Sequence, residues 1–377
     1  MALKGVKVIE FAGLAPAPFC GMILADFGAD VIRVNKINDR GTLDRLANGK
    51  KSIAVNLKDT KGVQIMKELC KESDVLIEPF RAGVMEKNGL GPEILLRDNP
   101  NLIYARLTGY GQKGLYKNSA GHDINYVGLS GLLSLFGRKD EKPTFPVNVV
   151  ADFGGGGLMC ALGILMALFE RSRSGRGQVV DCSMVEGTAY LGSWLYRSQN
   201  LPIWGQQRGE NVLDSGAHFY DVYRTKDEKF VTVGALEEQF YMKLLQGLGL
   251  NEDDAPQFGQ FDEMKKIFEE KFLQKTQKEW CEIFDGIDAC VGPLLDLKDA
   301  PNHPHNVESF VDTEEGKFPK PAPVLSRTPA ESQCLKKSPD CGEHTREILE
   351  TLLGYGADEI DQLEVQGIVQ SRSKSKL

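Results

Sequence analysis

The first third of the chain alternates between short apolar, β-branched runs and longer segments that carry an apolar residue every three or four positions. The short runs predict strands at 7–11, 30–34, 52–57, 74–78 and 102–107. Between the third and fourth runs, the apolar stripe of 60–71 predicts an amphipathic helix. This alternation is typical of α/β proteins with a doubly wound, mainly parallel sheet. Near-continuous apolar strands such as VLIEP and LIYARL fit burial on both faces of that sheet.

The later pattern predicts a second, smaller domain. Helices are expected at 121–137, 153–173 and 185–200, with a strand at 178–184. Beyond a long polar connection, the pattern predicts strands at 218–224, 230–235 and 289–294 and helices at 238–248, 261–273 and 277–285. The Pro-rich FPKPAPVL is an extended return, and 342–370 reads as two helices. We therefore expect a large α/β domain (1–200), a linker (201–222), a small α+β domain (223–310) and a return segment whose C-terminal helices pack on the large domain (311–377).

Composition narrows the choice of partners and compartment. The 377 residues carry a net charge of −8, which argues against nucleic acid or an anionic membrane as the main partner. No uninterrupted apolar run reaches the length of a membrane span, and the eight cysteines form no CxxC pair, so buried thiols in a reducing compartment are expected. The tripeptide Ser375–Lys376–Leu377 matches the signal read by the peroxisomal import receptor. A peroxisomal address is predicted, with the mitochondrion as the second address and a solvated basic tail as the alternative meaning of the tripeptide.

Familiar cofactor fingerprints do not appear in the sequence. The first strand-to-helix turn, GLAPAPFCG, lacks GxGxxG spacing, and there is no Walker A lysine motif, HExxH or GxSxG. The four glycines Gly154–Gly157 resemble a phosphate loop, but no lysine follows and an apolar helix begins directly. Close helix packing is therefore the favoured interpretation of these glycines.

Three ionisable residues lie in apolar company at the ends of predicted elements. They are His122 in GHDINYVGLSG, Asp152 in NVVADFGGGG and Glu237 in VTVGALEEQF. Active-site groups concentrate at such ends in α/β folds. Each residue also has a purely structural interpretation: Asp152 as a helix N-cap, His122 as a buried imidazole and Glu237 as a first-turn acid facing the helix dipole.

Over nearly its whole length the chain resembles the family III CoA-transferase superfamily. The resemblance rests on VIEFAGLAPAPFCGMILADFGADVIRV, DVLIEPFRAGVMEK, LIYARLTGYGQ, ADFGGGGLMCALGI, SGRGQVVDCSMVEGTAYL, VGALEEQFY and EWCEIFDGIDACVGPLL. AGHDINYVGLSG and the pair Asn148 and Asp152 are typical of members that racemise 2-methylacyl-CoA thioesters. The resemblance thus implies the family's fold, an intertwined homodimer and an enzyme that interconverts the (2R) and (2S) thioesters in lipid and bile-acid metabolism.

The resemblance also implies the catalytic roles. His122 and Asp152 would be acid/base groups on opposite faces of the α-carbon, with Glu237 paired to His122 and Asn148 positioning Asp152. Racemisation requires removal of a weakly acidic α-proton and return of a proton to the other face of a planar enolate, which favours two groups. Backbone N–H groups near Asp152 would bind the enolate oxygen. No metal or redox cofactor is expected, since CoA is part of the substrate.

By the same resemblance, a set of residues would bind CoA. It comprises Lys36, Val55, Asn56, Leu57 and Lys58, then Arg81 and Lys87, and around His122 the residues Gly121, Asp123, Ile124, Asn125 and Tyr126, of which Asp123 and Tyr126 would line the pantetheine end. Two positions depart from the family pattern. Lys36 stands where arginine is common, which loses the bidentate fork but keeps the charge. His218 stands where proline is usual, near the expected substrate mouth.

Two other functions compete with racemisation. A CoA-transferase of this family would use Asp152 as a nucleophile, but it has little use for His122 and tends to carry a glycine-rich loop near Glu237. A catalytically inactive acyl-CoA-binding protein predicts loss of an acid/base residue, and none is lost. The acyl chain stays open, since branched fatty acyl, bile-acid precursor and arylpropionyl thioesters all satisfy the pattern.

Overall fold

The computed structural model describes residues 1–39 and 43–371 of the protein. These form two compact units, one of Met1–Ser130, Val147–Leu191 and Phe310–Leu377, the other of Gly131–Pro146 and Gly192–Ser309. The division differs from the expected boundaries. Residues 131–146 and 192–200 belong to the second unit instead of the large domain, the expected linker 201–222 is part of the second unit, and Phe310 belongs to the first. The tripeptide Ser375–Lys376–Leu377 lies outside the described residues.

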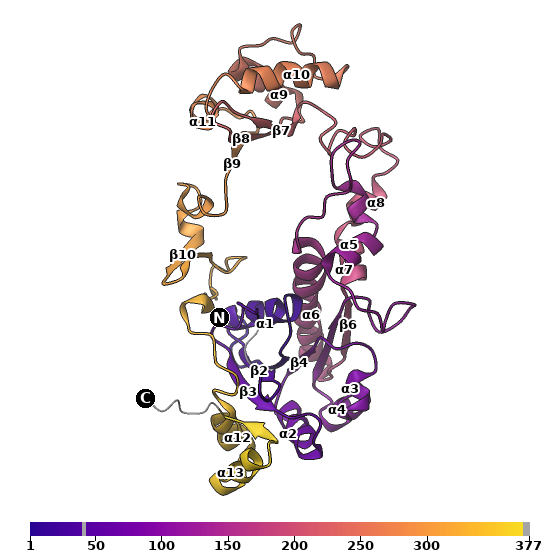
Figure 1. The fold of residues 1–377 in the computed structure, drawn as a ribbon, viewed down its shortest axis with the longest axis vertical. Helices are drawn as coiled ribbons and strands as arrows, with labels where there is room; N and C mark the ends of the chain where they lie inside the picture. Colours follow the sequence, from indigo (N-terminus) through magenta and orange to yellow (C-terminus); the bar gives the residue numbers. More distant parts are fainter. Residues whose placement is uncertain (40–42, 372–377) are drawn as a thin grey trace. The chain divides into compact units, whose positions relative to one another are not determined.

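A seven-stranded sheet organises the first unit (Figure 1). Its strands are β1 (Lys7–Phe11), β2 (Asp30–Asn35), β3 (Lys51–Val55), β4 (Val75–Glu78), β5 (Ile103–Thr108), β6 (Val179–Ser183) and β12 (Val369–Gln370), in the order β12-β3-β2-β1-β4-β5-β6. All neighbours pair in parallel except β12, which runs antiparallel to β3. Every residue of β4 and β5 is buried. The predicted doubly wound, mainly parallel α/β fold is therefore confirmed, and its strand order is that of dinucleotide-binding sheets.

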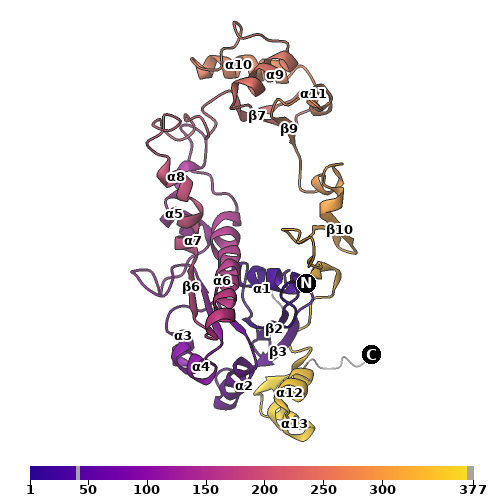
Figure 2. The ribbon, with the colours of Figure 1, turned by 180° about the vertical axis from the view of Figure 1, so that it is seen from behind.

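Helices cover both faces of this sheet (Figure 1). They are α1 (Pro16–Asp26), α2 (Thr60–Lys71), α3 (Val84–Lys87), α4 (Pro92–Asp98), α5 (Asp123–Leu129), α6 (Met159–Ser174), α7 (Met184–Leu191), α12 (Thr345–Leu353) and α13 (Ala357–Val365). The predicted helix at 60–71 has the observed bounds of α2, because the side chain of Asp59 accepts the Lys61 N–H at 2.8 Å and fixes the start. Figure 2 shows α12 and α13 beside β3 and α2, where Ile348 and Leu349 join the core of the sheet. The first unit also contains a hairpin that the pattern did not predict, β10 (Phe310–Thr313) with β11 (Gly316–Pro319), and a short 3₁₀ turn, Gln333–Leu335.

The helix predicted at 153–173 begins four residues earlier, as a π-helix. This π-helix, η2 (Val149–Leu158), runs directly into α6. Together they make a helix, Val149–Ser174, that is long and apolar enough to cross a bilayer by length and composition. The sequence shows no uninterrupted apolar run of that length here, because Gly154–Gly157 and Gly163 divide the apolar positions. One such helix is weak evidence for a span, since core helices pass the same test, and α6 packs on β5 and β6.

The glycine run inside η2 packs against neighbouring helices. A Cβ on Gly155 would lie 2.5 Å from the Thr188 nitrogen of α7, and one on Gly157 would lie 2.7 Å from the Pro16 oxygen of α1. These glycines therefore let three helices approach one another, as the packing interpretation predicted. Phe19 of α1 and Phe153 of η2 add an edge-to-face ring contact at 5.1 Å.

A buried ion pair fixes the first turn of α1. Lys50 Nζ lies 2.7 Å from Glu10 Oε2, with both side chains fully buried, and it donates to the Pro18 carbonyl at 3.0 Å. Removing one partner of such a pair leaves an uncompensated charge in the core, which costs about 3–5 kcal/mol. The pair thus anchors the surface of α1 on which η2 rests.

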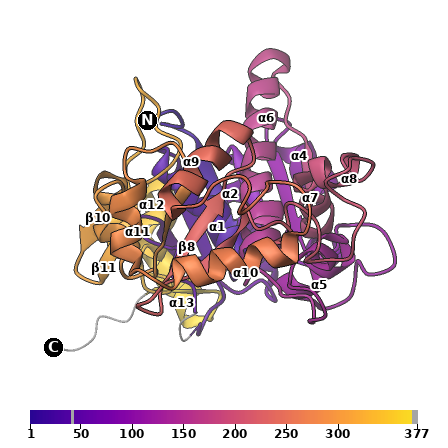
Figure 3. The same cartoon turned by 90° about the horizontal axis from the view of Figure 1, so that it is seen from above.

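The second unit is a small antiparallel sheet covered by helices (Figures 1 and 3). Its strands β7 (Tyr220–Arg224), β8 (Phe230–Gly234) and β9 (Val291–Leu294) pair in that order. Helices α9 (Glu238–Leu248), α10 (Phe261–Phe272) and α11 (Gln277–Phe284) pack on it around an aromatic core that includes Phe219, Tyr241 and Phe268. Its remaining elements are α8 (Ser193–Arg197) and the 3₁₀ turns Leu132–Leu135, Ala300–Asn302 and Val307–Ser309.

Two predicted helices are shorter than expected. The helix predicted at 121–137 ends at Leu129, and Gly131 follows in the left-handed region with φ 84°, which an α-helix cannot continue through. The helix predicted at 185–200 is divided into α7 and α8 at Gly192. In both places a glycine marks the boundary between the two units.

Candidate active site

His122 and Asp152 both lie in the first unit, at the starts of two helices that pack together. His122 immediately precedes α5, and its side chain is exposed. Its backbone N–H donates to Asn125 Oδ1 at 3.0 Å, which fixes the start of the helix. Asp152 lies in the first turn of η2 and is half-buried. The structure therefore keeps both groups within reach of the surface.

The surroundings of Asp152 raise its pKa to about 6. Burial is the main cause, and the negative charge of Asp123 adds to it. A hydrogen bond from the Asn148 side chain and the positive charge of His122 act in the opposite direction. The His122 charge acts on Asp152 only because the two side chains lie close enough to interact. Asp152 can thus gain or lose a proton near neutral pH.

Asp123 joins the two helices. Its Oδ1 accepts the backbone N–H groups of Ala151 and Asp152, each at 2.8 Å, and only 4% of the residue is exposed. Two N–H groups expected to bind an enolate oxygen are therefore occupied by a side chain of the protein. The expectation that Asp123 lines the pantetheine end differs from this arrangement, because its carboxylate points into the helix contact. The sequence carried one signal for this role, an acid at the first position of a helix.

Glu237 belongs to the second unit, where it is the N-cap residue of α9. Its side chain is exposed, and its carbonyl accepts the Phe240 and Tyr241 N–H groups. Its negative charge contributes to the raised pKa of Cys290, after burial and Asp288. The pairing of Glu237 with His122 stays a prediction.

The predicted CoA-binding cations gather near one edge of the sheet. Lys36 follows β2, Lys58 follows β3 and Arg81 follows β4, and all three are exposed. These strands are parallel, so their carboxyl ends face the same way. Ligands of doubly wound sheets bind outside this edge. Lys87 is also exposed, at the end of α3.

Several other predicted contacts are already used within the protein. Val55 is 2% exposed, and Asn56 Nδ2 donates to the Gly367 carbonyl at 3.3 Å. Leu57 packs against the core of the sheet. The Tyr126 hydroxyl donates to the Gly121 carbonyl, and burial is the main reason that the pKa of Tyr126 rises to about 12. Ile124, 43% exposed, and Asn125 remain accessible on α5.

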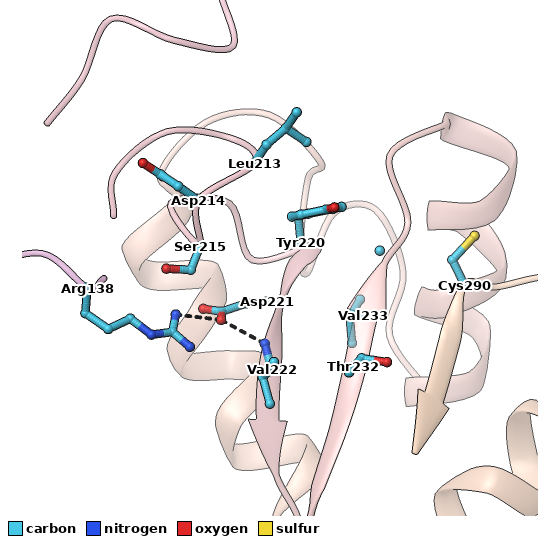
Figure 4. A pocket seen from close by; sticks show the side chains of 11 residues that line it. Arg138, Leu213, Asp214, Ser215, Tyr220, Asp221, Val222, Thr232, Val233 and Cys290 are labelled. Carbon is cyan, nitrogen blue, oxygen red and sulfur yellow. Dashed lines mark hydrogen bonds and ion pairs between the residues drawn. The ribbon is translucent and has the colours of Figure 1, made fainter. Parts of the chain in front are cut away.

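A cavity of about 450 Å³ in the second unit was not anticipated (Figure 4). Tyr220, Thr232 and Cys290 are among the residues that line it. Asp221 at its wall accepts from Arg138 at 2.7 Å and from the Val222 N–H at 2.8 Å, as the dashed lines show. Its lining residues all come from the second unit and differ from the predicted site residues.

His218 departs from the family pattern, and the structure shows where its side chain lies. It is fully buried in the aromatic core of the second unit, and its Nε2 lies 2.7 Å from the Tyr241 hydroxyl. That hydroxyl donates to the Ala255 carbonyl, so His218 must donate through Nε2–H. A substrate mouth was expected here, and instead the imidazole is enclosed by rings of Phe219, Tyr241 and Phe268.

Comparison with known proteins shows the family of the chain. Residues 3–345 match CoA-transferase family III. The chain is 56% identical to the alpha-methylacyl-CoA racemase of Mus musculus and 54% identical to that of Homo sapiens, covering 98% of this chain and 98% of each relative. A crystal structure of a CAIB/BAIF family protein from Brucella suis superposes with a TM-score of 0.80 at 25% identity, covering 93% of this chain and 99% of that one.

Proposed function

The chain belongs to CoA-transferase family III, and from that premise we propose that it interconverts the (2R) and (2S) forms of 2-methylacyl-CoA thioesters. The observation that carries the proposal is the pair His122 and Asp152. The two residues start neighbouring helices, interact electrostatically, and one of them has a pKa of about 6. Relatives with the racemase name span the full length of the chain, which supports the same reaction.

The proposed mechanism is a proton transfer at each face of one carbon. One group removes the α-proton, the thioester becomes a planar enolate, and the other group returns a proton to the opposite face. His122 and Asp152 therefore exchange roles between the two directions, and together they hold one proton in the active state. Asn148 donates to Asp152 and orients its carboxyl. Glu237 is proposed to act with His122 through its exposed carboxylate.

The substrate's CoA would bind at the carboxyl edge of the sheet. Lys36, Lys58 and Arg81 offer exposed positive charges there, which suits the phosphates of CoA. No further cofactor is part of the proposal, since neither proton transfer changes a redox state. The acyl group is left as any 2-methyl-branched chain.

We also infer that the chain forms a homodimer. Leu158 at the end of η2 and Leu162, Leu165, Met166 and Phe169 of α6 recur at helical spacing and are each 39–61% exposed. Such a stripe on one helix face is typical of a surface covered by another protein. A second copy of this chain is its proposed partner, and sedimentation of the purified protein at several concentrations tests it.

The address of the protein is proposed to be the peroxisome. The support is Ser375–Lys376–Leu377, which the import receptor for such tripeptides would read. Fluorescence microscopy of the tagged protein with and without these three residues tests the proposal.

The experiment that tests the reaction uses deuterated water. The protein is incubated with a (2R)-2-methylacyl-CoA, and α-deuteration and epimerisation are followed by NMR and chiral chromatography. Racemisation predicts both changes without an added carboxylic acid. CoA transfer that occurs only when a free carboxylate is added would instead establish the transferase reaction, with Asp152 as its nucleophile.

A further inference from the structure

Asp123 holds a position that the proposed reaction does not yet explain. It is the first residue of α5, directly after His122, and it bonds to the backbone of Asp152. Its side chain is thus adjacent in sequence to one acid/base group and hydrogen-bonded to the main chain of the other. A carboxylate so deeply buried is costly unless its interactions compensate.

The Asp123 carboxylate bonds two consecutive backbone N–H groups of η2, and we call this contact the Asp123 clamp. Oδ1 accepts from both Ala151 and Asp152 at 2.8 Å, and these N–H groups lie in the first turn of η2, where a helix has no carbonyl to bond them. Oδ2 is buried and has no hydrogen-bond partner among the described residues. One oxygen therefore secures the helix, while the carboxylate as a whole places a negative charge beside Asp152.

The charged and titratable groups that face Asp152 are few. They are His122, Asp123 and Tyr126, from α5 and the residue before it, while the uncharged Asn148 side chain bonds to Asp152 from the start of η2. The residues of α1 and α7 that lie nearest the glycines of η2, Pro16 and Thr188, are uncharged, and the charges that act on Asp152 are those of Asp123 and His122. Asp123 is thus the negative charge that acts on Asp152.

We propose that Asp123 is a positioning residue: its buried carboxylate fixes the backbone of Asp152 against the helix that begins beside His122, and its charge favours a proton on the neighbouring carboxyl. This inference rests on the proposed function, because the reaction needs one proton shared between His122 and Asp152. A fixed negative neighbour keeps Asp152 able to hold that proton near neutral pH.

The test separates the charge of Asp123 from its hydrogen bonds. In Asp123→Asn the remaining oxygen can still accept both N–H groups, and the amide nitrogen replaces an oxygen that has no partner. The Asp152 carboxyl is titrated by ¹³C NMR, with its signal assigned through Asp152→Asn. The expected result is that the Asp152 midpoint falls by about half a pH unit or more. The acid limb of the kcat/KM profile should move with it.

A matched control is Asp26→Asn. Asp26 ends α1, is 7% exposed, and accepts the Gln333 backbone N–H at 2.8 Å, so it too is a buried carboxylate bonded to main chain. Its change should leave the Asp152 midpoint unmoved. Asp123→Glu, which keeps the charge, should hold the midpoint closer to wild type than Asp123→Asn does, at reduced kcat because the clamp is displaced.

The outcomes decide the proposal in each case. An unchanged Asp152 midpoint in Asp123→Asn, or an equal shift in Asp26→Asn, overturns it. If Asp123→Asn does not fold, Asp123→Ser replaces it, since a hydroxyl accepts N–H bonds without charge, and the same shift is required. The NMR titration needs no turnover, so failure of the wild type to exchange its substrate's α-proton would reject the proposed function separately.

Discussion

Two histidines of this chain, one exposed and one buried, lie in different surroundings although the segments around them look alike. GHDINY and AHFYD each place a histidine beside an acid and an aromatic ring. His122 is exposed at the start of α5, where its charge acts on Asp152, whereas His218 is sealed in an aromatic core with one nitrogen bonded to Tyr241. The comparison teaches that local composition does not distinguish a reactive imidazole from a structural one. The element on which the residue lies, and the face it occupies, make the difference.

The largest contrast is expected in activity. His122→Gln and Asp152→Asn should each lower kcat by about 10²–10⁴-fold, because proton transfer to or from the α-carbon loses one of its two groups. His218→Gln should retain most of the activity at pH 7.5, since glutamine can also donate to the Tyr241 hydroxyl. Rates of α-deuteration measure all three variants. Wild-type activity in His122→Gln would show that His122 has no role in the mechanism, and the two histidines would then not differ in activity.

The second contrast is in the response of stability to acid. Burial, with a smaller effect of the Lys265 charge, lowers the pKa of His218 to about 4. In the unfolded chain its pKa is about 6.5, so the folded state resists protonation and is favoured fully only above that value. As the pH falls from 7.5 to 5, the second unit should lose about 2 kcal/mol of stability from this residue.

His218→Gln should lack that part of the loss. All three tryptophans, Trp194, Trp204 and Trp280, lie in the second unit, so urea unfolding followed by tryptophan fluorescence reports on it directly. An acid-induced loss of equal size in wild type and variant would show that His218 does not titrate as its enclosure requires.

The smallest contrast is in the pH profile of the reaction. The active state holds one proton on the His122–Asp152 pair, and a second proton inactivates it. Because the pKa of Asp152 is raised to about 6, kcat/KM should fall about tenfold per unit below pH 6. The profiles of the two directions should coincide, since the equilibrium between epimers does not depend on pH. A kcat/KM that stays constant between pH 7 and pH 5 would contradict the single shared proton.

Much of the first unit could be predicted from the sequence because its strands and helices carry their own signals. The period of apolar residues located β1 and α2. The hairpin of β10 and β11 was missed because it lacks an apolar run, with every residue of β11 exposed. The π-helix was missed because its start depends on a side chain far away in the sequence, Asp123, which bonds Ala151 and Asp152.

For the site, the sequence identified His122, Asp152 and Asn148, and the structure brings these three together. It did not show that Asp123 turns inward, nor that Val55 is buried, because the direction of a side chain depends on the packing of elements distant in the chain. The surroundings of His218 could not be predicted for the same reason: only the tertiary structure reveals that the rings of Phe219, Tyr241 of α9 and Phe268 of α10 surround it.

The π-helix sets the direction in which Asp152 points through the number of residues between it and α6. Each α-helical residue advances the chain by about 100° and about 1.5 Å. Removing one residue from Gly154–Gly157 would therefore turn Asp152 by roughly a quarter of a circle about the helix axis relative to α6, even though no acid or base had been substituted. The reaction at the α-carbon therefore constrains the number of these glycines as well as their small size.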